Sequence, residues 1–374
     1  MVAADIEQSP AVALVARLTR LANPQSLVDA RLAIAREVAA QAAMKEPITA
    51  ALVVGSTALG RCSAGADLDL VLVTPALSAR ATFETQTVRG VRVEIERMGQ
   101  SQALAVTDGE GWIWELRQAA RLACGVAVHD PQGFATRLAQ RAASMRPWSS
   151  RCEAALRDVY VSVAELGLAG GDPFRRAEVV RGCLDNLVVL ALLERPRRYQ
   201  KAKWALADLL HAGETDLVNA VLRAYGAVLD STSSARQAIA AARALVEAVL
   251  RHCRAPSHDA LIDMGYAPQF AEASYVSRCL ADAEDLASSG RLLEAQYVAR
   301  FAGRLAAGLT SPKHGAPSIL GTFEQTDPAI AALYVALLGG VAEPGSEIVD
   351  IILNSADARA KFLETGSSPI EVAR

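Results

Sequence analysis

The sequence predicts an α+β protein, in which a small mixed β-sheet domain is followed by a large all-helical region. Three observations lead to this class. Short apolar or alternating runs, which are typical of strands, are concentrated between residues 48 and 96. From about residue 131 onward, apolar residues recur at helical spacing between breaks at Gly, Pro or Ser. Hydrophobic residues make up 52% of the 374 residues and charged residues 21%, so the chain can bury a sizeable core.

The first forty-odd residues are predicted to be helical. Apolar residues recur at helical spacing from Val12 to Leu18, and Asn23-Pro24 interrupts the pattern. A second helix is expected from Ser26 to Met44, with Ser26 as its candidate N-cap.

Strands follow in close succession. Ile48 to Val54 is an apolar run that ends at Gly55-Ser56, which indicates a buried strand and a turn. Residues 67–73 alternate acidic and apolar side chains before becoming wholly apolar, and residues 88–96 alternate again. A short fourth strand is expected at residues 126–128.

The rest of the chain is predicted to be helical. The expected helices cover residues 131–144, 150–168, 174–193, 199–211, 214–228 and 233–254, and a further helical block follows Pro256. We therefore expect three regions. Residues 1–130 form the sheet domain with its N-terminal helices, residues 131–230 a helical domain, and residues 231–374 a C-terminal helical region without an assigned role.

Composition excludes several classes of function. The formal charge is −3 and aromatic residues make up 5%, which argues against a duplex nucleic-acid binder and against templated polymerisation. The N-terminal stretch lacks the pattern of a secretory signal, and the longest apolar run, residues 187–193, is too short to span a bilayer. The six cysteines are scattered without a C-x-x-C pair. We expect a cytoplasmic protein with reduced cysteines and no membrane partner.

The stretch from Val53 to Val73 carries the chemistry. A strand delivers Gly55 and Ser56 to a tight turn, where Gly permits close approach of the backbone to a ligand. A short helix is expected to begin there, and its first amides can donate to a phosphate. Asp67 and Asp69 follow two residues apart on a strand, so their carboxylates face the same side. Two such carboxylates can share divalent metal ions, and Mg²⁺ commonly combines a few carboxylates with substrate phosphates.

A third acid on a neighbouring strand can complete a two-metal site. Glu94 is the favoured candidate, but Glu96 lies on the same face of its strand and stays an alternative. Alternating acids are also ordinary on a half-solvated sheet, so each of these signals is weak by itself. The conjunction of strand, Gly-Ser turn, Asp-x-Asp and a further acid-bearing strand is what favours a site.

This pattern resembles the nucleotidyltransferase superfamily that includes DNA polymerase β, in its small-molecule and antibiotic-modifying branch. Gly55, Ser56, Asp67 and Asp69 match the family pattern position for position, whereas Ala66 stands where many members have Ser. The resemblance implies a palm-like fold with two Mg²⁺ ions held by Asp67, Asp69 and Glu94. It also implies that the triphosphate lies over the Gly-Ser turn.

A basic and aromatic cluster supports the resemblance. It comprises Arg195, Arg197, Arg198, Tyr199, Lys201, Lys203 and Trp204. Related enzymes often carry a Tyr followed by Lys-Trp in the helical domain that faces the active site. The resemblance therefore implies that Lys203 is a nucleotide-binding residue, with Lys201 as the next candidate. The alternative is a solvated basic helix end.

The expected activity is Mg²⁺-dependent transfer of a nucleoside monophosphate, with AMP from ATP favoured, to a hydroxyl or phosphate of a small molecule. Two alternatives stay open. One is a transferase that modifies a protein, as in AMPylation, and the other is a non-catalytic nucleotide-binding or scaffold protein. The region from residue 231 is a candidate acceptor lid, homodimer surface or separate interaction module. The acceptor and the base preference cannot be read from the sequence.

Overall fold

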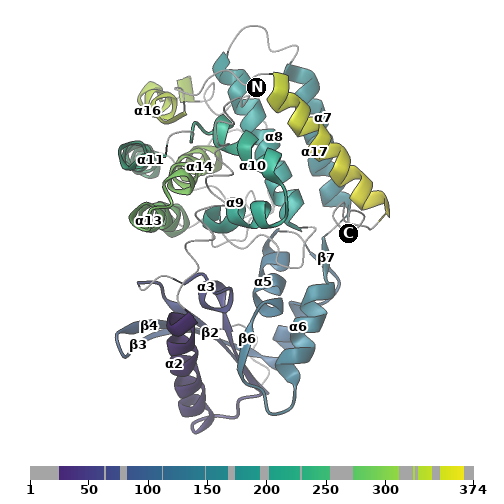
Figure 1. Cartoon of the computed structure of the whole chain (residues 1–374), viewed down its shortest axis with the longest axis vertical. Coiled ribbons are helices and arrows are strands. Elements are labelled where there is room, and N and C mark those ends of the chain that lie inside the picture. The colour runs from purple at the N-terminus through teal and green to yellow at the C-terminus, as the bar shows by residue number, and fades with distance from the viewer. Residues whose placement is uncertain are drawn as a thin grey trace, which may run out of the picture. The chain divides into compact units, whose positions relative to one another are not determined.

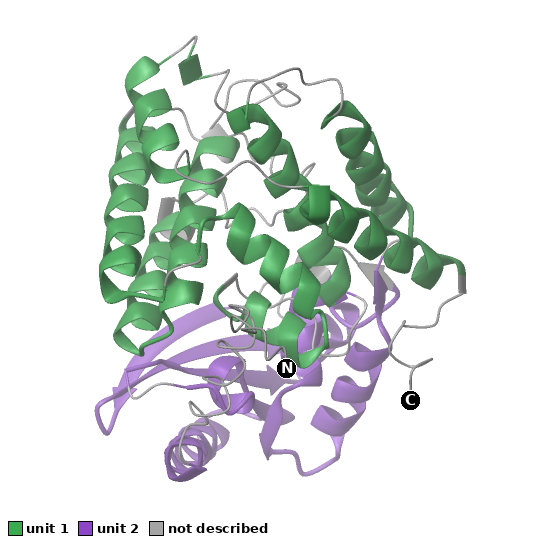
Figure 2. Cartoon of the chain, turned by 45° about the horizontal axis from the view of Figure 1, so that its top comes forward, with its two compact units in different colours: residues 1–17, 149–192, 201–374 green, residues 18–148, 193–200 purple. Residues whose placement is uncertain are grey.

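The structure is a computed structural model of the whole chain. It describes residues 25–62, 65–75, 82–111, 113–147, 149–166, 173–193, 202–227, 230–252, 273–310, 323–324, 327–338 and 346–365. These residues belong to two compact units, which are coloured separately in Figure 2. The described elements up to residue 147 form the sheet unit, and those from Ser149 onward form the helical unit. The predicted α+β class is confirmed.

The sheet unit is built on a five-stranded mixed sheet with the order β3-β4-β2-β1-β6. Its strands are β1 (Ala50–Val54), β2 (Leu68–Thr74), β3 (Thr82–Val88), β4 (Val91–Gly99) and β6 (Val126–His129). The pairing of β2 with β4 is parallel, and the other three pairings are antiparallel. The central strands β2 and β1 consist largely of buried apolar residues, as expected for strands covered on both faces.

Helix α2 (Gln25–Ala43) covers one face of this sheet (Figure 1). Its buried side chains include Ile34 and Val38, and they share one apolar core with Val53, Leu70 and Ile95 from the strands. Side chains alternate between the two faces of a strand, so Asp69 and Glu94 face away from this core.

Helices α5 (Ile113–Ala123) and α6 (Phe134–Ser144) contact each other and the strand β1. Figure 1 shows them on the side of the sheet away from α2. The short elements α3 (Gly55–Ala58), α4 (Gln100–Ala105), β5 (Glu110–Gly111) and β7 (Arg146–Pro147) complete the unit. Of these short elements and α5, the sequence predicted only α3, as the short helix that begins at the Gly-Ser turn.

The predicted single strand over residues 88–96 is wrong in its extent. The structure has a hairpin instead, in which β3 ends at Val88, Arg89 and Gly90 form the turn, and β4 begins at Val91. Both turn residues have positive φ, +50° and +78°. This is the backbone of the two-residue turn that matches the twist of a hairpin. Strand β3 was not predicted because its side chains are mostly polar and exposed, as on many edge strands.

The helical unit consists of nine helices with at least ten residues among the described residues. They are α7 (Ser149–Leu166), α8 (Pro173–Leu193), α9 (Ala202–His211), α10 (Thr215–Ala224), α11 (Thr232–His252), α13 (Ala273–Ser288), α14 (Leu292–Thr310), α16 (Pro328–Leu338) and α17 (Ser346–Thr365). Helices α6 to α11 lie within four residues of the predicted bounds. The helix predicted around residues 12–18 lies outside the described residues.

Helices far apart in the sequence pack together in this unit. The helix α11 packs along α13 and α14, and α17 packs along α7 (Figure 1). Among the described elements, the division between the two compact units falls between β7 and α7, whereas the predicted regions divide after residues 130 and 230. Within the described residues, none of the helices combines the length and the apolar character needed to cross a membrane.

A buried polar network joins four elements of the helical unit. The Asp185 carboxylate on α8 is ion-paired with Arg304 on α14, and it accepts hydrogen bonds from the Tyr225 hydroxyl at 2.8 and 2.9 Å. Arg181 is fully buried and donates to the carbonyl oxygens of Ala224 at 2.8 Å and Leu338 at 3.0 Å. These carbonyls end α10 and α16, where helices carry unpaired acceptors and partial negative charge.

The pKa shifts in this network follow from burial. Desolvation raises the pKa of the Asp185 carboxyl, although the charge of Arg304 and the Tyr225 hydroxyl oppose that shift. Desolvation also lowers the pKa of Arg181. The network therefore holds charges out of water by surrounding them with partners, and the helix ends are two of these partners.

Candidate active site

Three carboxylates converge at one end of the sheet. One oxygen atom from each of Asp67, Asp69 and Glu94 lies within 4.8 Å of the other two, and all three side chains are partly buried. Asp67 directly precedes β2, Asp69 is the second residue of β2, and Glu94 lies in β4. Asp69 and Glu94 are direct partners in the parallel pairing of these strands. Among the described residues, no other three His, Cys, Asp or Glu side chains come together in this way.

The structure separates the two glutamates that the sequence left as alternatives. Glu96 lies opposite Val71 in the sheet, two pairs further along than Asp69 and Glu94. It is buried and accepts a bond of 3.1 Å from Arg121, which lies in the last turn of α5. Glu96 is therefore part of the packing between the sheet and α5. Glu94 is the glutamate that lies with the two aspartates.

The predicted Gly-Ser turn lies against the acid cluster. Val54, the last residue of β1, pairs with Asp69, and Gly55 follows it with a φ of +69°. A Cβ atom on Gly55 would lie 2.1 Å from Asp69 Oδ2. Only glycine therefore leaves room for the Asp69 carboxylate while adopting this backbone conformation. Ser56 is the next residue of α3, and its side chain is partly exposed.

A surface arginine lies at the outer side of the cluster. Arg92 Nη2 is 2.7 Å from Glu94 Oε1, and the two side chains are 64% and 40% exposed. Exposed ion pairs of this kind contribute at most about 1 kcal/mol. A divalent cation that binds the three carboxylates can therefore replace Arg92 as the partner of Glu94 at a small energetic cost.

A buried arginine, which the sequence analysis missed, contacts the cluster from the other face. Arg31 on α2 donates from Nη1 to the backbone carbonyl oxygen of Asp67 at 3.0 Å. Its side chain is 1% exposed. The sequence feature that could have indicated its burial is its position on the apolar face of the helix, three and four residues before Ile34 and Ala35.

The donor set fits a hard divalent cation such as Mg²⁺. Oxygen ligands from carboxylates are those that Mg²⁺ and Ca²⁺ prefer, whereas zinc sites usually contain His or Cys. Because Gly55 has no Cβ atom, Asp69 Oδ2 has room to lie beside the carboxylates of Asp67 and Glu94. Asp67, Asp69 and Glu94 are the residues that would hold such an ion.

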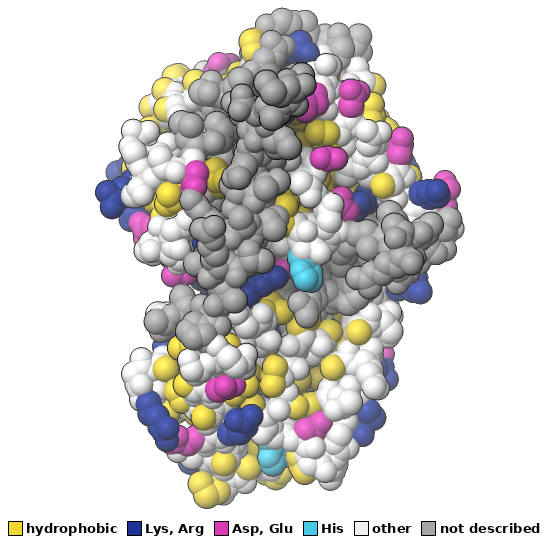
Figure 3. All heavy atoms as spheres, in the orientation of Figure 1, with side chains coloured by type: hydrophobic (Ala, Val, Ile, Leu, Met, Phe, Trp, Pro, Cys, Tyr) yellow, Lys and Arg dark blue, Asp and Glu magenta, His cyan; other side chains and the backbone are white. Residues whose placement is uncertain are grey.

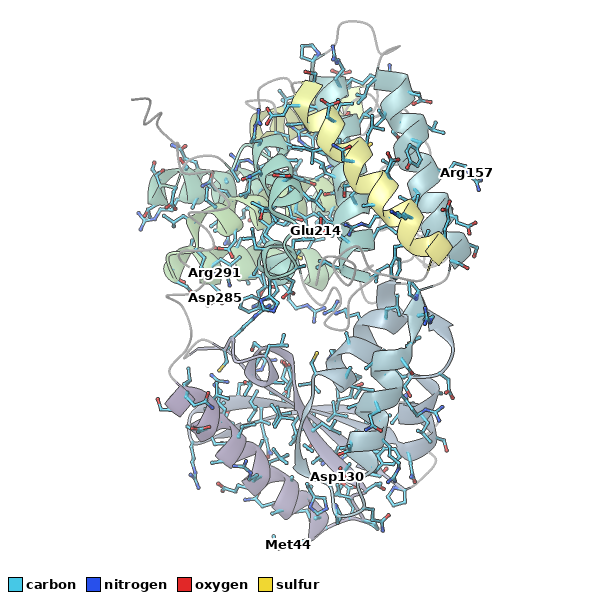
Figure 4. All side chains as sticks on the ribbon, turned by 45° about the vertical axis from the view of Figure 1, so that its right-hand side comes forward. Met44, Asp130, Arg157, Glu214, Asp285 and Arg291 are labelled. Carbon is cyan, nitrogen blue, oxygen red and sulfur yellow. The ribbon has the colours of Figure 1, made fainter. Side chains whose placement is uncertain are left out.

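Lys203 lies in the helical unit, at the start of α9. Its Nζ is 2.5 Å from Asp282 Oδ1 on α13 and 5.6 Å from the centre of the Trp204 ring. The Arg291 guanidinium, labelled in Figure 4, lies 4.6 Å from the centre of the same ring. The Trp204 ring therefore lies beside two cations. Lys201 and the predicted basic residues from Arg195 to Tyr199 lie outside the described residues.

Comparisons with known proteins give little beyond this geometry. No protein-family model matches the chain, and no curated protein matches it. Among solved structures, the chain is similar to the crystal structure of a nucleotidyltransferase-like protein from Exiguobacterium sibiricum 255-15, with a TM-score of 0.30 and 14% identity. The similarity covers 50% of this chain and 63% of that chain, which is less than two thirds of its length. A similarity of this extent assigns neither an activity nor a residue role.

Proposed function

We propose that this protein is a divalent-metal-dependent nucleotidyltransferase. It would move a nucleoside monophosphate from a nucleoside triphosphate to a hydroxyl or phosphate of a small molecule, with release of pyrophosphate. The observation that carries this proposal is the convergence of Asp67, Asp69 and Glu94 beside the Gly55-Ser56 turn. Mg²⁺ bound there would neutralise the triphosphate and lower the pKa of the acceptor hydroxyl.

The residues of the sheet unit would divide the work. Asp67 and Asp69 would hold both metal ions, and Glu94 would hold the second one and accept the proton of the acceptor hydroxyl. The acceptor oxygen would form a bond to the α-phosphorus while the bond from that phosphorus to the bridging oxygen of the β-phosphate breaks. The electron pair of the broken bond would leave with pyrophosphate. Ser56 and the neighbouring backbone would contact the β- and γ-phosphates.

Lys203 would contact the leaving pyrophosphate. This role rests on the resemblance of Lys203-Trp204 to related enzymes, and it is supported by the position of Lys203 Nζ, 5.6 Å from the centre of the Trp204 ring. The ammonium group would have to exchange its partner Asp282 for phosphate. We therefore expect replacement of Lys203 to raise the Michaelis constant for the nucleotide.

A small-molecule acceptor is favoured over a nucleic acid. The formal charge of −3 provides no excess of cations for a phosphate backbone. On the face drawn in Figure 3, the coloured acidic and basic side chains are scattered and do not form one basic patch. ATP is the proposed donor, a small molecule the proposed acceptor and the cytoplasm the proposed location. The helical unit is the proposed surface for a homodimer.

The test is thermal unfolding with each of the four nucleoside triphosphates, with and without Mg²⁺. It compares the wild type, the double variant Asp67→Asn/Asp69→Asn and the control Glu84→Gln, which neutralises an exposed acid on β3. We expect a Mg²⁺-dependent rise in Tm that is selective for one nucleotide. It should be lost in the double variant and kept in the control. An equal rise in the double variant would overturn the proposal.

Label transfer from the α-phosphate of the selected nucleotide then identifies the acceptor class. Label in a small-molecule product that is absent with the double variant supports the proposal. Label in a protein band instead would indicate protein modification. Nucleotide binding that needs neither metal nor the two aspartates would favour a scaffold role.

A further inference from the structure

We propose that Arg31 is a positioning residue that holds Asp67 in its metal-binding place and thereby sets the affinity of the acid cluster for divalent cations. This inference rests on the proposed function, because it takes the cluster to be a metal site. It concerns a residue of α2, which the proposed reaction does not otherwise use.

The burial of Arg31 requires a specific reason. Its side chain lies on the apolar face of α2 with Ile34, Ala35 and Val38, and it is 1% exposed. Taking a charged group out of water costs several kcal/mol unless it gains strong partners. An apolar residue at this position would continue the helix face without that cost. One such partner is the carbonyl oxygen of Asp67, which accepts a bond of 3.0 Å from Arg31 Nη1.

Asp67 needs such an anchor more than the other two acids do. Asp69 is fixed from both sides, because it pairs with Val54 on β1 and with Glu94 on β4. The first described pair of the β2–β4 ladder is Leu68 with Val93, so Asp67 lies just before the paired part of the strand. The sheet alone therefore does not fix the Asp67 backbone. Arg31 supplies a bond at this point from an element that is itself packed on the sheet.

Positioning and simple charge predict opposite effects on metal binding. If Arg31 acted only through its positive charge, its removal would strengthen the binding of a cation to the three carboxylates. If Arg31 holds Asp67 in place, its removal releases one of three ligands and weakens binding. Loss of a residue that orients a metal ligand typically reduces affinity by about 10- to 100-fold.

The experiment measures the affinity of the full-length protein for Mn²⁺ by electron paramagnetic resonance, with Mg²⁺ as competitor and without nucleotide. The variants are Arg31→Met and Arg31→Lys. The matched control is Arg36→Met, which removes an exposed arginine from the same helix. Asp69→Asn reports on the metal site itself. Circular dichroism and thermal unfolding measure the folded fraction, so that affinities refer to folded protein.

We expect Arg31→Met to weaken Mn²⁺ binding by about tenfold or more and Arg36→Met to leave it unchanged. Arg31→Lys keeps the charge but loses the planar fork, so it should weaken binding less. If the Arg31→Met variant does not fold, the Arg31→Lys variant still tests the inference. Unchanged or tighter binding in the folded Arg31 variants, with binding lost in Asp69→Asn, would overturn this inference alone. Binding that Asp69→Asn does not reduce would instead overturn the proposed function.

Discussion

The sheet unit and the helical unit each gather charged side chains, but they do so in opposite ways. In the sheet unit, Asp67, Asp69 and Glu94 are partly exposed at the end of a sheet face, and the partner of Glu94 is a surface arginine. In the helical unit, Asp185 lies among partners that are mostly buried, and both of its oxygens accept hydrogen bonds. The carboxylates of the first cluster are partly exposed, whereas both carboxylate oxygens of Asp185 accept hydrogen bonds from protein groups.

The difference teaches that the Asp185 cluster is closed by its own protein partners, whereas the three acids of the sheet unit stay partly exposed. Charges that are removed from water and saturated by protein donors connect the elements from which they come. Asp185, Tyr225 and Arg304 connect α8, the end of α10 and α14 in this way. Carboxylates held together by strand register at a partly open position repel one another unless a cation joins them. The following variants test this contrast.

The largest effect on stability is expected from Asp185→Asn in the helical unit. This change removes the charge that balances Arg304, whose side chain is 19% exposed. Removing one partner of a fully buried pair typically costs about 3–5 kcal/mol, so a loss toward the lower end of that range is expected. Chemical denaturation followed by circular dichroism measures the loss. The control Glu347→Gln breaks an exposed pair with Arg223 and should cost below about 1 kcal/mol. Mn²⁺ binding by folded Asp185→Asn should equal that of the wild type, and a loss there would contradict the contrast.

Gly55→Ala should damage the acid cluster more than it damages the fold. A positive φ costs an L-residue about 1–2 kcal/mol, and the new Cβ would meet Asp69 Oδ2 at 2.1 Å. Because that oxygen ends a rotatable side chain, the carboxylate can turn away. Gly60→Ala is the matched control, since Gly60 has a φ of +66° and open space at its Cβ position. Both variants should lose similar stability, but only Gly55→Ala should lose Mn²⁺ binding. Equal binding by the two would contradict the role of Gly55.

Arg92→Gln should tighten the binding of Mn²⁺ by about two- to fivefold, because the ion pair with Glu94 no longer competes with the metal. Arg89→Gln is the control, since Arg89 is an exposed arginine on the same hairpin and pairs with Glu37. Calorimetric titration of both variants measures the change. Weaker binding in Arg92→Gln would mean that this arginine supports the cluster.

The smallest expected effect concerns pH and lies in the helical unit. Burial and the Asp357 carboxylate raise the pKa of Tyr160 to about 12. Between the unfolded value near 10 and this folded value, the native state keeps a proton that the unfolded chain releases. Stability should therefore fall as pH rises through this window, and Tyr160→Phe should make the fall shallower. Denaturation curves at pH 9, 10 and 11 compare the two proteins. If the stability of the two proteins falls equally with rising pH, the raised pKa of Tyr160 is contradicted.

The sequence predicted well those elements in which buried positions carry apolar side chains and exposed positions carry polar ones. Residues 50–54 and 68–74 are almost wholly apolar because the strands β1 and β2 lie inside the sheet. Strand β3 lies at an edge, where Thr, Glu and Gln satisfy the backbone geometry without any apolar pattern. Its turn at Arg89-Gly90 also lacks the Asn-Gly pair by which such turns are usually identified.

The acid cluster was predictable in part for a similar reason. Asp67 and Asp69 are two residues apart, so their proximity follows from local strand geometry. The choice between Glu94 and Glu96 depends on how β4 aligns with β2 and on Arg121 from α5, and both are non-local. Arg31 was not predicted as a residue near the site, because an arginine on a helix is normally exposed to solvent. Only the structure shows that this side chain is buried.

The parallel pairing of β2 with β4 has a consequence for how the protein folds. Parallel neighbours need a crossover of a dozen or more residues, and here the hairpin strand β3 lies within that crossover. The three acids therefore come from one continuous stretch, residues 67–94, whose contacts are local compared with those joining α7 to α17. Low contact order favours fast folding. During synthesis, this stretch leaves the ribosome before most of the helices, so the strands that carry the three acids can pair while the helical unit is still being translated.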